Sequence, residues 1–270
     1  RIEMRVRETR RPLHHGSRLA ASVTAGTDAG RPTSAMGLAF PNPLGLAAGV
    51  DRTGALIPSL NAHGFGHIEI GTITPARGYA GALGRRDART RIGVNIGSGR
   101  HGLDDQVIED YAATLRQVYG LCDYIVANLS APTLHRDGNT PGVETLVKRL
   151  GVARDVLSAV GGHRVPLLLK LEAGRRGTPF PTAVLVMRSA GIDGVVLVSE
   201  DLDRIRAIAT HLDGLTVISV GGVQTAEDVQ ARIAAGASLV QVHRAFADGG
   251  APRIRRILRG LATTSVERHP

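Results

Sequence analysis

The chain has little of several residue types, and each shortage excludes something. Tryptophan is absent, and aromatic residues make up only 3% of the 270 residues. The core must therefore be built from Val, Leu, Ile and Ala, as is usual in strand-rich α/β interiors. A single cysteine, Cys122, excludes an intrachain disulfide and fits a reducing compartment, so we expect a cytoplasmic protein. No run of about 18 apolar residues occurs, so we expect no membrane span.

Lysine is equally scarce, since the 33 basic residues include only two lysines, and the formal net charge is +9. The arginines are scattered, and no aromatic residues alternate with them as base-stacking platforms would require. Nucleic acid is therefore not the expected partner. A basic surface that favours anionic ligands or membrane surfaces is the simpler interpretation. We expect a small-molecule substrate and little peripheral membrane contact, and the sequence leaves an oligomer open.

One of the two lysines, Lys170, lies in the apolar run Pro166–Glu172, which is typical of a buried strand. Burying an ammonium group is costly unless an anion or a hydrogen-bond acceptor meets it. A ligand or a reacting group would supply such a partner, which makes Lys170 a candidate catalytic residue. The alternative is an ion pair with Glu172 or with another carboxylate of the fold, in which case the lysine has a structural role.

The pattern of the chain predicts an α/β fold. Short β-branched runs alternate with segments of helical period, and their number and spacing favour a closed (β/α)8 TIM barrel over an open doubly wound sheet. We assign a short basic N-terminal arm to residues 1–35, the barrel to 36–264 and a tail to 265–270. The expected strands are Leu44–Val50, His67–Thr74, Arg91–Gly97, Tyr124–Ser130, Pro166–Glu172, Gly194–Glu200, Leu215–Gly221 and Leu239–Arg244. The expected helices are Thr53–Ala62, Asp104–Tyr119, Gly142–Val160, Pro181–Ala190, Asp201–His211, Thr225–Ala235 and Ala251–Leu261.

Functional side chains of such a barrel gather at the carboxyl ends of the strands. The seventh expected strand leads into Gly221 and Gly222, which precede a helix that begins near Thr225, and the eighth ends at His243 and Arg244. Glycines let a backbone approach a phosphate, while free N–H groups and the helix dipole favour the anion. The two strand ends together predict a phosphate site. The alternative is that the glycines serve only a tight turn between strand and helix.

Two asparagines extend this pattern. Asn95 and Asn128 lie near the ends of apolar strands, where their amides need partners that both donate and accept. A flat heterocycle with carbonyl and ring N–H groups would satisfy them, and Lys170 would sit against its electron-rich edge. A phosphate at one end and such a ring at the other describe FMN, whose reduced ring a lysine would stabilise. We therefore expect FMN as the cofactor and no metal site.

Several stretches between residues 36 and 260 carry a family resemblance. They are Met36–Asp51, Gly64–Pro75, Gly93–Gly97, Ala127–Pro132, Gly191–Val195, Val220–Val223 and Ile233–Gln241. In these the chain resembles the dihydroorotate dehydrogenase family, most closely its quinone-linked class, which implies a (β/α)8 barrel that binds FMN. By this resemblance the FMN-binding residues are Ala48, Gly49, Thr72, Asn95, Asn128, Lys170, Gly221, Gly222, His243 and Arg244.

The substrate side departs from the family pattern after the fourth strand. The family reads Asn-x-Ser-Ser-Pro-Asn-Thr, whereas this chain reads Asn128-Leu-Ser-Ala-Pro-Thr-Leu134. Ala131 replaces the serine that deprotonates carbon 5 of dihydroorotate, and a methyl group takes no proton. Thr133 replaces an asparagine that would hold the pyrimidine. His135 lies close enough in sequence to serve as a replacement base, with a solvated loop histidine as the alternative.

Other substrate positions differ as well. Arg52 stands where the family has a lysine, and the two side chains are not interchangeable. Ser199 and Glu200 end the sixth expected strand, where the resemblance implies neutral donors. The loop at residues 75–90 is shorter than the family's substrate loop. We assign substrate binding to Arg52, Asn128, Thr133, Ser199 and Glu200.

These departures lead us to expect an FMN-dependent oxidoreductase acting on CH–CH or related bonds of a small molecule other than dihydroorotate, with a specialised biosynthetic pathway as one setting for it. One alternative is a genuine dihydroorotate dehydrogenase of pyrimidine biosynthesis. Another is a barrel without redox chemistry, either a Schiff-base lyase that uses Lys170 or a pseudoenzyme with a protein partner. Because about 35 arginine-rich residues stand where quinone-linked members carry a helical extension, we expect no quinone tunnel and leave the electron acceptor open.

Overall fold

The computed structural model describes residues 32–78, 89–131 and 140–266, and these form a closed barrel of eight parallel strands. The strands lie side by side in sequence order, and the last pairs with the first to close the ring. They are β3 (Leu44–Leu46), β4 (His67–Ile73), β5 (Arg91–Ile96), β6 (Tyr124–Asn128), β7 (Leu167–Glu172), β8 (Gly194–Val198), β9 (Thr216–Val220) and β10 (Leu239–Val242). Each overlaps a strand expected from the sequence, so the prediction of a (β/α)8 barrel is confirmed.

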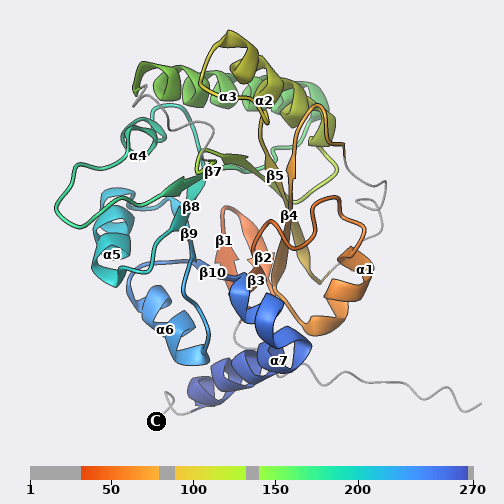
Figure 1. Ribbon diagram of the computed structural model, residues 1–270, viewed down its shortest axis with the longest axis vertical. Helices are drawn as coiled ribbons and strands as arrows, with labels where there is room; N and C mark the ends of the chain where they lie inside the picture. The colour runs from red at the N-terminus through yellow and green to blue at the C-terminus, as the bar shows by residue number, and fades with distance from the viewer. Residues whose placement is uncertain (1–31, 79–88, 132–139, 267–270) are drawn as a thin grey trace, which may run out of the picture.

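Helices surround the barrel (Figure 1). They are α1 (Ile57–Leu60), the 3-10 helix η1 (Asn61–His63), α2 (Asp105–Val118), α3 (Thr140–Gly161), α4 (Thr182–Val186), α5 (Leu202–His211), α6 (Ala226–Ala234) and α7 (Arg244–Val266). The larger apolar core lies between these helices and the outer faces of the strands. No helix in the described ranges is long and apolar enough to cross a bilayer.

Three helices differ from the expected ranges. The helix expected at Thr53–Ala62 begins only at Ile57, because the Asp51 carboxylate holds the preceding segment in a tight turn. It accepts backbone N–H groups of Thr53, Gly54 and Leu56 at 2.8–3.1 Å. Helix α4 is only five residues long. Gly250, with φ of 54°, interrupts α7, so that the helix expected from Ala251 follows an additional helical segment that begins at Arg244.

A β-hairpin closes the amino-terminal end of the barrel. Strand β1 (Thr33–Ala35) pairs antiparallel with β2 (Leu38–Phe40). The Met36 backbone N–H donates to Oγ1 of Thr216, the first residue of β9, at 2.9 Å. Phe40 is buried among interior side chains of the barrel, and the hairpin lies at the centre of the strand ring in Figure 1. The sequence pattern does not predict this hairpin, since strands of three residues are too short to show alternation.

The interior of the barrel contains a group of polar side chains. Along β4, Ile68 and Ile70 face the outer helices, whereas His67 and Glu69 face inward and have no exposed surface. This alternation is the ordinary period of a strand. Asn95 of β5 and Gln241 of β10 are also fully buried. The barrel therefore has an apolar outer layer and a partly polar centre beneath its carboxyl-terminal end.

Candidate functional site

The carboxyl ends of β3, β4 and β10 come together around Gly49. The Gly49 N–H donates to the Gly71 carbonyl at 3.1 Å. A Cβ on Gly49, whose φ is +109°, would lie 3.2 Å from Nε2 of His243. Ala48, Gly49 and His243 all keep exposed surface. The absence of a side chain at Gly49 thus leaves open backbone where these strand ends meet.

A chain of hydrogen bonds links the polar residues at this end of the barrel. The buried Glu69 carboxylate accepts from Nδ2 of Asn95 at 2.8 Å and from Nε2 of Gln241 at 2.7 Å. Oγ1 of Thr72 donates to Oδ1 of Asn95 at 2.8 Å and accepts from Nδ2 of Asn128 at 3.2 Å. Asn95 lies one layer below the surface, whereas Thr72 and Asn128 are partly exposed. Asn95 therefore orients the two residues above it.

Asn128 is also held from the side. Its Oδ1 accepts the backbone N–H of Ser130 at 3.1 Å and the Ser130 hydroxyl at 2.8 Å. Its backbone carbonyl accepts the hydroxyl of Tyr111, which reaches across from α2. Burial raises the pKa of the Tyr111 hydroxyl, so it remains a donor at neutral pH. The amide of Asn128 is thus fixed at the edge of the strand ring.

A carboxylate lies near Lys170, as the ion-pair interpretation of this residue requires. The ammonium Nζ lies 3.9 Å from Oε1 of Glu69, one of the other carboxylates of the fold that the sequence left open beside Glu172. This distance is longer than a hydrogen bond. In the described part of the chain it is the single ionic contact recorded for Lys170, whose side chain keeps 13% of its surface exposed. The ion pair and a role toward a ligand are therefore compatible.

The expected phosphate loop follows β9. Gly221 and Gly222 have φ values of +118° and +64°, and Thr225 caps α6 with a capping box. The buried guanidinium of Arg232 donates to the Ser199 carbonyl and to the Ser219 hydroxyl, both at 2.8 Å, and to the Gly221 carbonyl. Burial lowers the pKa of Arg232. Arg232 thus fixes the Gly221 carbonyl of this strand-to-helix loop and the Ser199 carbonyl of the neighbouring segment after β8, which gives the loop a defined shape.

A carboxylate lies beside this loop. Glu200 follows β8, and its Oε1 is 4.0 Å from the Arg244 guanidinium, with both side chains largely exposed. A Cβ on Gly222 would come within 2.9 Å of Cδ of Glu200. Ser199 also lies here, because its carbonyl contacts Arg232. The structure thus brings together the predicted residues Ser199, Glu200, Gly221, Gly222 and Arg244.

The remaining predicted substrate residues are less well placed. Arg52 is exposed on the turn after β3. Ala131 is partly buried just beyond the end of β6. Thr133 and His135 lie outside the described residues, as does most of the short loop at 75–90. Cys122 is buried at the opposite end of the barrel, as expected for a structural thiol.

Three residues at the carboxyl-terminal end of the barrel were not singled out from the sequence. Glu69 and Gln241 connect the network, and Arg232 fixes the glycine loop. A signal for Glu69 exists in His67-Ile-Glu-Ile70, where polar residues occupy alternate positions of an otherwise apolar strand. Arg232 gives no such signal, since arginines on helices are usually exposed.

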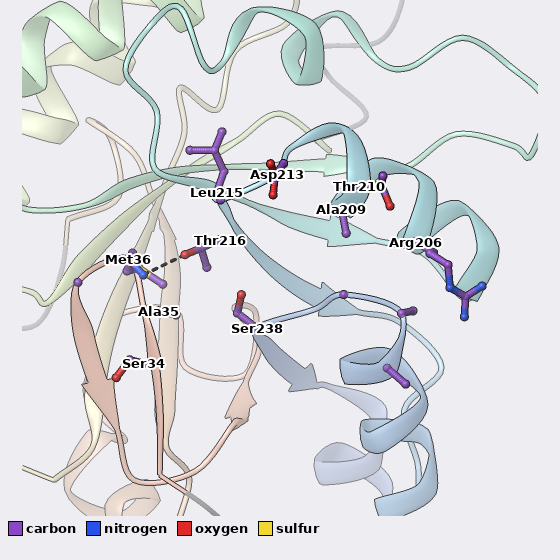
Figure 2. A pocket seen from close by; sticks show the side chains of 15 residues that line it. Ser34, Ala35, Met36, Arg206, Ala209, Thr210, Asp213, Leu215, Thr216 and Ser238 are labelled. Atoms are coloured by element: carbon purple, nitrogen blue, oxygen red, sulfur yellow. Dashed lines mark hydrogen bonds between the residues drawn. The ribbon is translucent and has the colours of Figure 1, made fainter.

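A cavity of about 670 Å³ lies at the other end of the barrel, next to the hairpin. Figure 2 shows Met36, Thr216, Ser238, Arg206 and Asp213 among the residues that line it. Thr216 opens β9, and Ser238 precedes β10, so the cavity is at the amino-terminal ends of the strands. It is separate from the network around Lys170. Among the described residues no cluster of His, Cys, Asp and Glu has the arrangement of a metal site.

Comparisons with known proteins decide the family. The chain is 33% identical over 281 residues to dihydroorotate dehydrogenase (quinone) of Xylella fastidiosa (strain M12), covering 78% of each chain. It is 30% identical over 302 residues to the protein of the same name from Flavobacterium lutescens, covering 85% of this chain and 86% of that one. The chain belongs to the dihydroorotate dehydrogenase family.

Two further comparisons agree with this assignment. The family model described as dihydroorotate dehydrogenase matches residues 181–264. A crystal structure of DHODH from Eimeria tenella in complex with ferulenol superposes with a TM-score of 0.73 at 20% identity, covering 87% of this chain and 84% of that one. At this identity the likeness speaks for the fold. The protein is an oxidoreductase of this family, and FMN is the cofactor that the family implies.

The described residues fit FMN. Thr72, Asn128 and Lys170 supply a hydroxyl, an amide and an ammonium with exposed surface at one side of the strand ring. Gly221 and Gly222 supply backbone without a Cβ at another side, next to Arg244. These groups match a polar ring edge and a phosphate, respectively. Within the described ranges Glu200 is the one anionic group recorded beside Arg244, and its exposed side chain is able to turn toward solvent.

Proposed function

We propose that this protein binds FMN at the carboxyl-terminal end of the barrel and oxidises or reduces a CH–CH bond of a small molecule. The observation that carries this proposal is the joint arrangement of Lys170, Asn128 and Thr72 with the glycine loop held by Arg232. Neither a Schiff-base lyase nor a protein-binding pseudoenzyme needs both the polar group around Lys170 and a glycine loop suited to a phosphate. The named relatives also favour the oxidoreductase over these two alternatives.

Each residue has a defined task under this proposal. FMN, when bound, accepts or donates the hydride. Lys170 lies where its ammonium stabilises negative charge on the ring. Asn128 and Thr72 fix the orientation of the ring through hydrogen bonds. The backbone N–H groups after Gly221, together with His243 and Arg244, hold the phosphate.

Dihydroorotate is the first substrate candidate, because the relatives with about 30% identity or more carry its name. A second candidate, a different small molecule, is supported by Ala131. General base catalysis contributes typically about 10²–10⁴-fold, and the alanine methyl offers none. The carboxylate of Glu200 further disfavours an anionic substrate nearby. Both candidates use the same flavin chemistry and differ in the group that removes the proton.

Two measurements test the proposal in order. Purified protein should be yellow or should take up FMN with quenching of flavin fluorescence, and a protein that does neither contradicts the proposed function. Anaerobic stopped-flow mixing with dihydroorotate then separates the substrates. Reduction that completes within seconds supports dihydroorotate, whereas reduction over many minutes supports the second candidate. Dithionite reduction of the same sample controls for flavin that is bound but inaccessible.

A further inference from the structure

Glu69 occupies a position that the proposed function does not yet use. It lies in the floor of the strand ring and has no exposed surface. Its Oε1 accepts from Asn95 and lies 3.9 Å from the Lys170 ammonium, while its Oε2 accepts from Gln241. Three strands, β5, β7 and β10, thus direct polar groups at one carboxylate of β4. Two amide donors and an ammonium thus converge on this one carboxylate.

We propose that Glu69 is a positioning residue that holds Lys170 and Asn95 beneath the flavin ring and lowers the reduction potential of the bound FMN. This inference rests on the proposed function, since it requires FMN at this end of the barrel. Glu69 contacts the two residues above it and influences the ring by its charge without itself reaching the surface. The effect of Glu69 on the reduction potential comes from its contacts with Asn95, Lys170 and Gln241, and it does not depend on which substrate the protein uses.

The direction of the effect follows from charge. Reduction places negative charge on the ring, and Lys170 attracts that charge. The Glu69 carboxylate already lies 3.9 Å from the same ammonium, and it adds a second negative charge in a poorly solvated region, where charge interactions are strong. It therefore opposes reduction, whereas Lys170 favours it. Removing the Glu69 charge should strengthen binding of reduced FMN relative to oxidised FMN.

The variant Glu69→Gln removes the charge with little change in shape. The substituted side chain still accepts from Asn95 through Oε1. Its new amide group would face Nε2 of Gln241, which is a donor. The Gln241 oxygen has no hydrogen-bond partner among the described residues, so a flip of the Gln241 amide turns this oxygen toward the new donor. The substitution can therefore keep the network closed.

The measurement is the midpoint potential of bound FMN, obtained by anaerobic dye equilibration, together with the dissociation constants of oxidised and reduced FMN. For Glu69→Gln we expect the affinity for reduced FMN to rise about tenfold relative to the affinity for oxidised FMN. This change corresponds to a midpoint potential higher by about 30 mV for a two-electron couple. Asp123→Asn is the matched control. Asp123 is a poorly exposed carboxylate that pairs with Arg91 and accepts the Ile92 N–H at the amino-terminal end of β5, so its loss should leave the potential unchanged.

A second variant keeps the test independent of folding. Glu69→Gln combined with Gln241→Glu moves the carboxylate to β10 and preserves a Glu–Gln hydrogen bond. We expect a potential shift of the same sign and smaller size. An unchanged potential in both variants, with FMN still bound, overturns the inference and leaves the proposed function standing. A shift as large in Asp123→Asn also overturns it. A wild-type protein that binds no FMN overturns both.

Discussion

His67 lies inside the barrel with no exposed surface, between two aromatic rings. Its ring centroid is 5.7 Å from that of Phe40 and 6.2 Å from that of Tyr124. Neither ring nitrogen has a hydrogen-bond partner within the described residues. Burial lowers the pKa of His67 to about 3 from 6.5. The folded protein therefore keeps this histidine neutral at pH values where an exposed histidine takes up a proton.

Acid should destabilise the protein through this residue. Between about pH 6.5 and about pH 3 the unfolded chain binds a proton at His67 that the folded chain does not, so stability falls as the pH falls. The loss from one such group is at most roughly 1.4 kcal/mol per pH unit. We expect His67→Phe to make the unfolding free energy less dependent on pH in this window, as measured by urea titrations. His211→Gln, at an exposed histidine of α5, should keep the wild-type dependence, and equal slopes for all three proteins would contradict the prediction.

Ala131 offers a gain-of-function test at the same scale. If dihydroorotate is a poor substrate because the base is missing, Ala131→Ser should accelerate flavin reduction by dihydroorotate at least about tenfold. Ala131 lies just beyond the end of β6 and is partly buried, and serine adds one oxygen to its side chain. Stopped-flow absorbance of the flavin gives the rate, and Ala131→Gly controls for altered packing. No acceleration would mean that another group, such as His135, or another substrate decides the rate.

At the scale of elements, Arg232 connects α6 to two neighbouring strand ends. It contacts the Ser199 carbonyl after β8, and the Ser219 hydroxyl and Gly221 carbonyl of the β9 end. Replacing Arg232 would remove the hydrogen-bond donor from three acceptors on two elements at once. Unsatisfied buried acceptors each cost about 1–3 kcal/mol. The helix thus sets the shape of the glycine loop, in addition to providing its own N-terminus.

We expect Arg232→Gln to lower the unfolding free energy by roughly 2–4 kcal/mol and to weaken FMN binding more than riboflavin binding. The difference arises because the loop faces the phosphate, which riboflavin lacks. Fluorescence titrations of both flavins give the two affinities. Arg232→Lys tests the geometry, since one ammonium group does not reach three acceptors. Equal losses for FMN and riboflavin would show that the loop does not hold the phosphate.

The sequence predicts elements well where a period extends over many residues. Helix α2 follows from such a period, and the eight strands of the barrel follow from short apolar runs between helical segments. The segment after Asp51 does not, because a side-chain carboxylate takes the N–H groups that would otherwise enter a helix. The hairpin β1–β2 is too short for a period and is held by contacts with Thr216 and interior side chains far along the chain. Local hydrogen bonds from a side chain decide the first case, and tertiary contacts decide the second.

The site is predictable only in part for a related reason. Lys170, Asn128 and the glycine pair can be found from strand ends, because a closed barrel brings all strand ends to one face. The partner of Lys170 cannot be found in this way. Glu69 lies on β4, three strands away from β7 around the ring, and local sequence carries no information on which interior residues meet. The sequence therefore left open whether Glu172 or another carboxylate of the fold pairs with Lys170, and the structure shows that Glu69 lies near it.

At the scale of the whole molecule, the charge of +9 should influence how FMN arrives. Long-range attraction of the phosphate accelerates association and is screened by salt, since the Debye length falls from about 30 Å at 0.01 M to about 3 Å at 1 M. We expect the association rate of FMN to fall about tenfold over this range and that of uncharged riboflavin to change little. Stopped-flow quenching of flavin fluorescence at several salt concentrations gives both rates. Parallel salt dependences for the two flavins would contradict this prediction.

The seam between β10 and β3 has a consequence for biosynthesis. Val240 and Val242 pair with Leu44 and Leu46, about 200 residues earlier. A nascent chain on the ribosome thus carries an open sheet with two free edges until the last strand has left the exit tunnel. His243 follows β10 and emerges only at that stage, so we expect the cofactor to be loaded after translation of the barrel is nearly complete. Truncated chains that end before β10 should be substrates for chaperones and should bind no flavin.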